Sequence, residues 1–249
     1  MTLVNAIALN SKKPSILVSA DTRSMQGAEG DDQTNKIFPI AKNVLGAGAG
    51  VLNTIYDSIE GVQKDEIVTT KSAVQSIFDS TQSEISGRLR TSQGPKTSLE
   101  MSILIGGIDG VDPRLYSIYT SSTGQSDYFR IVEPFISAGS GSGVARPIIK
   151  QWVQFYEGKD YQTPLTATTL PRKSAIECLT AAHLAASEYT PTVGPEFKIS
   201  ELIFNGKHYV VKDVKTLPIR KIRKERDQMG ELFALMRNNP KAISNLLNQ

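Results

Sequence analysis

A threonine directly follows the initiator methionine, and this position makes it a candidate nucleophile. A small residue at the second position permits a methionine aminopeptidase to remove Met1, which would leave Thr2 at the amino terminus. Thr2 would then carry a hydroxyl nucleophile and a free α-amine on one residue, a self-contained nucleophile and base pair. Because the reference pKa of an α-amine is about 7.7 to 8, a large fraction can be neutral near neutral pH and accept the hydroxyl proton. Thr at this position is common, so the hypothesis depends on the rest of the chain.

The elements nearest Thr2 in sequence are predicted strands. Residues 3–9 and 15–20 alternate or run apolar, and the polar segment between them ends in Pro14, which indicates a hairpin. The second strand leads directly into Asp21. Residues 36–40 and 44–49 are predicted as two further strands. Thr2 therefore begins a β-region that also carries an acidic residue at the end of its second strand.

Helices follow in two pairs, each after a group of strands. Apolar residues at helical spacing predict a helix pair within residues 52–59 and 74–89, and a second pair after residue 143 and over residues 173–187. Between the pairs, residues 102–108, 115–119 and 128–136 are predicted to form a second sheet, and residues 197–204 and 207–211 a closing hairpin. Its Asn205-Gly206 pair is typical of a type I′ turn.

The order ββ, αα, ββ, αα, ββ predicts an α+β fold with four layers, αββα. In such a fold two antiparallel sheets pack together between helical layers, so that both faces of each sheet are covered. We expect this domain to span residues 1–217. Past Pro218 apolar stripes at helical spacing predict a helical C-terminal extension over residues 218–249, which we expect to be covered by a neighbouring subunit.

The bulk composition excludes several classes of protein. With 39% hydrophobic and 21% charged residues, the 249-residue chain is typical of a globular protein, and we expect no membrane span. The net charge of +3 is too small to indicate a nucleic-acid partner. One cysteine, Cys178, excludes an internal disulfide framework, and the start lacks the features of a secretory signal, so we expect a cytoplasmic protein.

Short motifs in a fixed order resemble the proteasome β-subunit family of N-terminal-nucleophile hydrolases. The likeness extends over roughly residues 2–211 and is carried by Thr2 together with five segments: Ser19-Ala20-Asp21-Thr22-Arg23, Asn35-Lys36-Ile37-Phe38, the glycine-alternating residues 46–50, Ile105-Gly106-Gly107-Ile108-Asp109-Gly110, and residues 137–143. The resemblance implies an αββα sandwich, the N-terminal-nucleophile hydrolase fold, and a threonine-type endopeptidase.

By position, the resemblance also implies roles for five residues. Thr2 corresponds to the nucleophile, Asp21 and Lys36 to the charged pair beside it, Gly48 to the backbone donor of the oxyanion hole, and Ser140 to the serine that supports the amine. A lysine there would favour deprotonated neighbours, and the aspartate would hold it charged and oriented. Ser140, or the nearby Ser142, can equally be a helix N-cap.

One part of the family pattern is missing. Family members carry an Asp and a Ser near the end of the fourth helix, where this chain reads Ala185-Ala186-Ser187-Glu188-Tyr189-Thr190-Pro191-Thr192, so Ser187, Glu188 or Thr190 is a possible substitute. This departure keeps two alternatives open: a catalytically silent structural subunit, or a transpeptidase or amidase that uses the same Thr2.

Partners follow from the resemblance, whereas cofactor sites are judged from the residues. We expect a peptide or unfolded-protein substrate and a homo-oligomer that forms a ring or a helix, and an ATPase unfoldase is a candidate partner. The glycine run at residues 46–50 lacks the third glycine of a dinucleotide fingerprint, because Val51 occupies that place. His183 and His208 have no ligand partner at metal-binding spacing, so we expect no cofactor and no metal.

Overall fold

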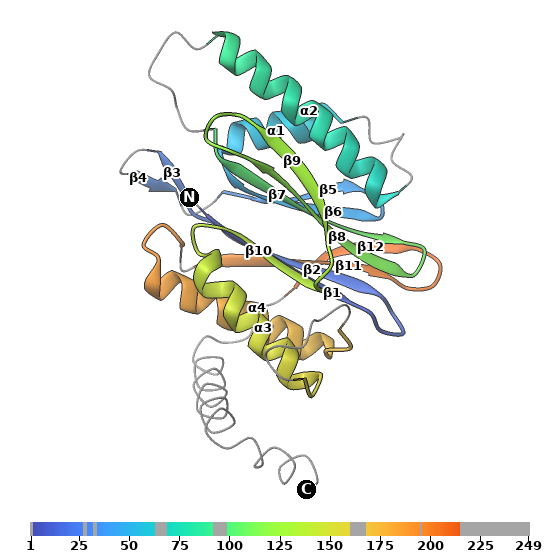
Figure 1. Cartoon of the computed structure of the whole chain (residues 1–249). Coiled ribbons are helices and arrows are strands. Elements are labelled where there is room, and N and C mark those ends of the chain that lie inside the picture. Colours follow the sequence, from blue (N-terminus) through green and yellow to red (C-terminus); the bar gives the residue numbers. More distant parts are fainter. Residues whose placement is uncertain are drawn as a thin grey trace, which may run out of the picture.

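The computed structural model describes residues 2–26, 29–31, 34–62, 69–91, 99–159, 168–194 and 196–214. Within them, two five-stranded antiparallel sheets pack face to face, and a pair of helices covers the outer face of each (Figure 1). The predicted four-layer αββα sandwich is therefore confirmed. The predicted extension over residues 218–249 lies outside the described residues.

The first sheet carries the amino terminus near its middle. Its strand order is β10-β1-β2-β11-β12, and every neighbouring pair is antiparallel. The strands are β1 (Leu3–Leu9), β2 (Ser15–Asp21), β10 (Phe135–Gly139), β11 (Phe197–Phe204) and β12 (Tyr209–Asp213). Every residue of β1 and β2 is buried, because the second sheet covers one face and helices the other.

The second sheet follows the chain in simple order. Its strands are β5 (Ile37–Ala41), β6 (Val44–Gly50), β7 (Met101–Asp109), β8 (Asp112–Thr120) and β9 (Ser126–Ile131). In the chain between β2 and β5, β3 (Ser24–Gln26) and β4 (Glu29–Asp31) form a separate two-stranded ribbon.

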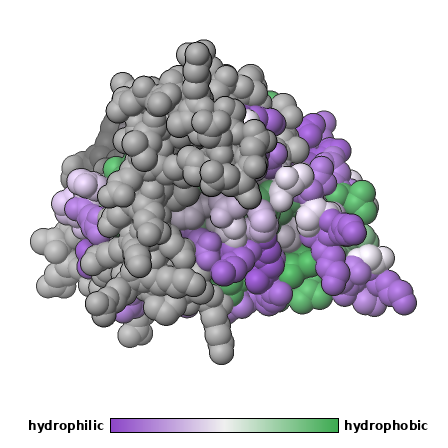
Figure 2. Space-filling view, turned by 90° about the horizontal axis from the view of Figure 1, so that it is seen from below, coloured by the Kyte–Doolittle hydropathy of each residue, from purple (hydrophilic) through white to green (hydrophobic). Residues whose placement is uncertain are grey.

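Two helices lie on each outer face. The second sheet carries α1 (Leu52–Glu60) and α2 (Thr70–Thr91), and the first sheet carries α3 (Ser142–Tyr156) and α4 (Arg172–Tyr189) (Figure 1). Helix α4 is buried from Ser174 to Ala186, and its many alanines let it pack closely against the first sheet and against α3. Seen from the side of α3 and α4, the described surface mixes hydrophilic residues with smaller hydrophobic patches (Figure 2).

The apolar core has three parts, one in each space between layers. One lies between the first sheet and α3 and α4, one between the second sheet and α1 and α2, and one between the two sheets. Small residues such as Ala6, Ala20 and Ala47 are common in the part between the sheets. At roughly 25 cal/mol per Å² of apolar area, burial on this scale dominates the stabilisation of the fold.

Two predictions about the β-structure are wrong. Residues 128–136 do not continue one sheet, because β9 ends at Ile131 and β10 pairs with β1 in the first sheet. The Asn205-Gly206 turn is not of type I′, which requires positive φ at both residues, because no described non-glycine residue has positive φ. Instead the Asn205 side-chain oxygen accepts the backbone N–H groups of Lys207 and His208.

Candidate active site

Strand β1 places Thr2 against a buried lysine. The Lys36 ammonium donates hydrogen bonds to Thr2 Oγ1, to the carbonyl oxygen of Arg23, and to Asp21 Oδ1 at 2.8 Å. The side chains of Lys36 and Asp21 are fully buried, and Thr2 is only 4% exposed. The structure thus brings together Thr2, Asp21 and Lys36, which lie up to 34 residues apart in the chain.

Asp21 is held by backbone groups as well as by the lysine. Its Oδ1 accepts the N–H of Leu3 at 3.3 Å, and its Oδ2 accepts the N–H of Gly194 at 3.2 Å. A buried ion pair stabilises a protein only when further hydrogen bonds satisfy its remaining atoms, and these bonds do so. Because Leu3 adjoins the nucleophile, Asp21 also fixes the backbone that carries Thr2.

Ser140 lies beside Thr2 but does not cap a helix. Its Oγ forms a 2.8 Å hydrogen bond with Thr192 Oγ1, and neither oxygen is assigned as the donor. Helix α3 begins at Ser142 with Gly141 as its N-cap, and no side-chain hydrogen bond caps it. The interpretation of Ser140 or Ser142 as a helix cap is therefore wrong, and Ser140 keeps only the role beside Thr2.

The partner of Ser140 is a residue that the sequence analysis did not select. Among the candidates near the end of α4, Ser187 donates its hydroxyl to the Leu184 carbonyl of the same helix at 2.8 Å. Thr192 instead reaches Ser140 from a turn in which Val193 N–H bonds to the Thr190 carbonyl. The same turn supplies Gly194 to Asp21, so residues 190–194 join both sides of the site.

Gly48 is not available as an oxyanion donor, which corrects the sequence prediction. Its N–H donates to the Lys36 carbonyl oxygen at 3.1 Å, and a Cβ at Gly48 would lie 2.7 Å from Ile55 Cγ2 of α1. Gly48 therefore faces the helices, whereas Gly50 borders the same cleft as Thr2. Gly50 has a φ of +114°, and a Cβ there would lie 2.4 Å from the Glu100 carbonyl, so this position requires glycine.

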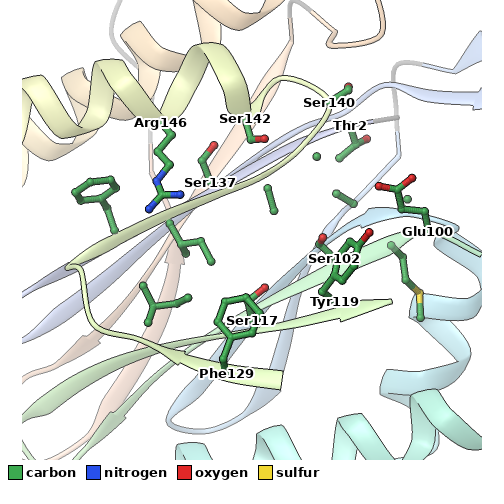
Figure 3. Close-up of a pocket in the computed structure, with 18 of the residues that line it drawn as sticks. Thr2, Glu100, Ser102, Ser117, Tyr119, Phe129, Ser137, Ser140, Ser142 and Arg146 are labelled. Carbon is green, nitrogen blue, oxygen red and sulfur yellow. The ribbon is translucent and has the colours of Figure 1, made fainter. Parts of the chain in front are cut away.

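A cleft of about 700 Å³ opens beside Thr2, between the edge strand β10 and strands β7 to β9. Thr2, Ser140 and Glu100 lie at one end of it, and Arg146 lies at the other (Figure 3). Hydroxyl groups of Ser102, Ser117 and Ser137 line the cleft together with aromatic and aliphatic side chains. A cleft of this size and mixed lining is typical of a small-molecule or peptide site.

His183 is fully buried in the core and does not line the cleft. Neither ring nitrogen has a hydrogen-bond partner, and the ring stacks on Phe197 with centroids 4.4 Å apart. Burial is the main cause that lowers the His183 pKa to about 3; a backbone group of Gly194 acts in the opposite direction, and the positive charge of Lys36 in the same one, so the ring is neutral at neutral pH. Within the described part of the chain, no group of three or more His, Cys, Asp or Glu residues could hold a metal ion.

A match to a protein-family model assigns the chain to a family. The model of the proteasome subunit family matches residues 6–174, more than half of the chain. The chain belongs to the proteasome subunit family. Its site residues Asp21, Lys36, Gly50 and Ser140 lie inside the matched region, whereas Thr2 and Thr192 lie outside it.

A solved structure of similar fold supports the αββα architecture. The Anbu (Gly-1) mutant from Hyphomicrobium sp. strain MC1 superposes with a TM-score of 0.67 over 94% of this chain and 97% of that chain. At 15% sequence identity the likeness shows the fold shared within the family. No curated protein matches the chain significantly. None of the helices in the described ranges has the length and apolar character needed to cross a membrane.

Proposed function

We propose that this family member is a threonine-type endopeptidase whose nucleophile is Thr2 after removal of Met1. The observation that carries the proposal is the contact between the Lys36 ammonium and Thr2 Oγ1, in a buried site where Asp21 holds the lysine at 2.8 Å. An ammonium beside a hydroxyl favours its deprotonated form, and burial strengthens that effect.

The reaction would proceed through an ester on Thr2. Oγ1 attacks the carbonyl carbon of the scissile bond while its proton passes to the Thr2 α-amine, directly or through a water molecule. The α-amine then returns this proton to the leaving nitrogen as the carbon–nitrogen bond breaks. Water hydrolyses the resulting ester and restores the Oγ1–H. The bonded pair of Ser140 and Thr192 hydroxyls supports the amine in this scheme.

The negative charge on the carbonyl oxygen requires a donor, and we assign that role to the backbone N–H of Gly50. Gly50 borders the cleft beside Thr2, and it lacks the Cβ that would otherwise collide with Glu100. A preorganised donor of this kind typically lowers the barrier by about 2.7 to 4 kcal/mol.

Cleavage of peptide libraries by variants at position 2 tests this proposal. Thr2→Ala should abolish cleavage and any covalent labelling by a peptide epoxyketone, whereas Thr2→Ser should retain a measurable part of both. Equal cleavage by the wild-type protein and Thr2→Ala would refute a role for Thr2. Thr54→Ala serves as a control, because Thr54 is a buried threonine of α1 that does not line the cleft.

Two alternatives remain distinguishable. A silent structural subunit was suggested by the incomplete pattern after α4, but Thr192 supplies a hydroxyl partner to Ser140 and weakens that reading. A transpeptidase or amidase is favoured by one observation, the cleft beside Thr2 that could hold an amine acceptor. Products formed with an added amine would separate ligation from hydrolysis.

Assembly and location remain predictions. We propose a homo-oligomer, either a ring or a helix, that acts in the cytoplasm on peptides or unfolded proteins, with an ATPase unfoldase as a possible partner. Light scattering of the full chain tests the first point, since a monomer at working concentration would contradict it.

A further inference from the structure

Two aromatic side chains on the inner face of the second sheet are partly uncovered. Leu115 of β8 points toward the first sheet and is buried there, and its cross-strand neighbour Ile131 packs in the same cluster. Alternation along the strands gives Tyr119 and Phe129 the same inward direction, yet they are 40% and 49% exposed. Inner side chains of packed sheets normally interdigitate. The two sheets therefore diverge here, and the cleft is the opening between them.

This opening leads to the nucleophile. Tyr119, Phe129 and Ile131 line the same cleft as Thr2 and Ser140 (Figure 3). Lys36 and Asp21 do not border the cleft: Lys36 contacts Thr2 from its buried side, and Asp21 holds the lysine there. A substrate whose reacting carbonyl lies at Thr2 Oγ1 must therefore extend one of its two halves into the opening.

The proton transfer indicates which half of the substrate extends into the opening. The group that takes the proton from Oγ1 must later donate it to the leaving nitrogen, so the leaving half lies on the side of the α-amine. In the proposed mechanism Ser140 supports this α-amine, and Ser140 borders the cleft. The leaving half is therefore the part of the substrate that this mechanism directs into the cleft.

We propose that this opening binds the leaving segment of the substrate and selects an apolar side chain in its first two residues, where Phe129, Tyr119 and Ile131 would cover it. The inference rests on the proposed function and adds a substrate class to it. Burial of a leucine-sized side chain against such a surface favours it over glycine by about tenfold or more.

Charge at the two ends of the cleft adds a second preference. Glu100 lies at the end near Thr2, and Arg146 lies at the far end, where it pairs with Glu133 at 2.7 Å (Figure 3). A carboxylate on the first residue of the leaving segment would meet Glu100 and be repelled. We therefore expect an acidic residue to be disfavoured at this position.

The test measures how an acyl-enzyme divides between water and amines. Thr2 is acylated with a peptide thioester, whose thiol leaves, and dipeptide amides are added as acceptors. The acceptor nitrogen attacks the ester carbon, its proton returns to Oγ1, and an amide product forms. Acceptors with leucine at the first or second position should give about tenfold more ligation relative to hydrolysis than glycylglycine amide. Aspartate at the first position should give less than asparagine, and Glu100→Gln should narrow that difference.

Variants locate the effect in the opening. Phe129→Ser should reduce the ratio of leucine to glycine ligation at least threefold, and this ratio does not depend on the rate at which the thioester acylates Thr2. Val132→Ser is the matched control, because Val132 is 72% exposed and does not line the cleft, and it should keep the full preference. Equal ligation of leucine and glycine acceptors, or a preference that Phe129→Ser leaves intact, would overturn the inference. Failure of the thioester to acylate Thr2 at all would instead refute the proposed function.

Discussion

Gly139 offers a sharp test of how the fold positions the nucleophile. Gly139 has a φ of +92° and pairs with Leu3, and a Cβ at this position would lie 1.9 Å from the Thr2 carbonyl oxygen. Carbon atoms of a side chain normally stay about 3.5 to 4 Å from their neighbours, so Gly139→Ala must displace Thr2 or β10 by about 1.6 to 2.1 Å. The positive φ alone costs about 1 to 2 kcal/mol for alanine.

A displacement of this size matters more for the reaction than for the fold. Misplacement of a reacting group by about 1 Å can lower the rate about 100-fold. We therefore expect Gly139→Ala to lower the rate of Thr2 acylation by about 100-fold, with a loss of roughly 1 to 3 kcal/mol in the free energy of unfolding. The acylation rate is measured by intact mass spectrometry against time, and unfolding by urea titration.

A nearby glycine provides the control. Gly143 lies in the first turn of α3, and a Cβ there meets nothing within 4 Å. Gly143→Ala should keep the acylation rate and the stability of the wild-type protein. Wild-type acylation by folded Gly139→Ala would refute the reasoning that β10 fixes Thr2 by direct contact.

Three further predictions concern groups around the site. Lys36→Ala should lower the free energy of unfolding by about 3 to 5 kcal/mol, because it leaves Asp21 buried without its cation. The double variant with Asp21→Ala should lose less stability than the sum of the two single variants. Urea titrations measure both effects. Thr192→Val should lower kcat/KM about three- to tenfold, because Ser140 loses its hydroxyl partner, and Thr192→Ser, which keeps a hydroxyl, should restore kcat/KM. Equal kcat/KM values for the two variants would contradict a role of the Thr192 hydroxyl. Burial lowers the His183 pKa to about 3 in the folded state, whereas the unfolded value is about 6.5, so the unfolded state binds a proton more readily between these values. The contribution of His183 to the free energy of unfolding is therefore fully present above about pH 6.5 and is lost as the pH falls toward 3. His183→Leu should therefore weaken the pH dependence of unfolding between about pH 6 and pH 4 by up to about 1.4 kcal/mol per pH unit, and an unchanged slope would argue that His183 is not buried and neutral.

Local patterns in the sequence predicted most of the fold. The apolar runs of β1 and β2 and the helical spacing in α1 to α4 predicted these elements within a few residues of their observed bounds. Strand β10 was assigned to the wrong sheet, because its partner β1 lies more than a hundred residues earlier and nothing local marks that pairing. At Asn205, side-chain hydrogen bonds to Lys207 and His208 gave a different turn from the one that Asn-Gly favours.

The site was predictable where one residue type has one plausible partner. Thr2, Asp21 and Lys36 were found by their motifs, and the structure brings them into contact. Gly48 and Gly50 share one glycine-rich strand, and only the packing against Ile55 and the bond to Lys36 show which of them is committed elsewhere. Thr192 was missed because its contact with Ser140 spans 52 residues and joins a turn to a strand end.

The central claim is that Thr2 acts as a nucleophile once Met1 has been removed. Intact mass spectrometry of the full chain, produced with an active methionine aminopeptidase and then treated with a peptide epoxyketone, tests both parts in one measurement. The account predicts a mass that lacks Met1 and gains one equivalent of the probe, located on Thr2 by peptide mapping. A soluble, folded chain that retains Met1 and remains unlabelled would contradict the account.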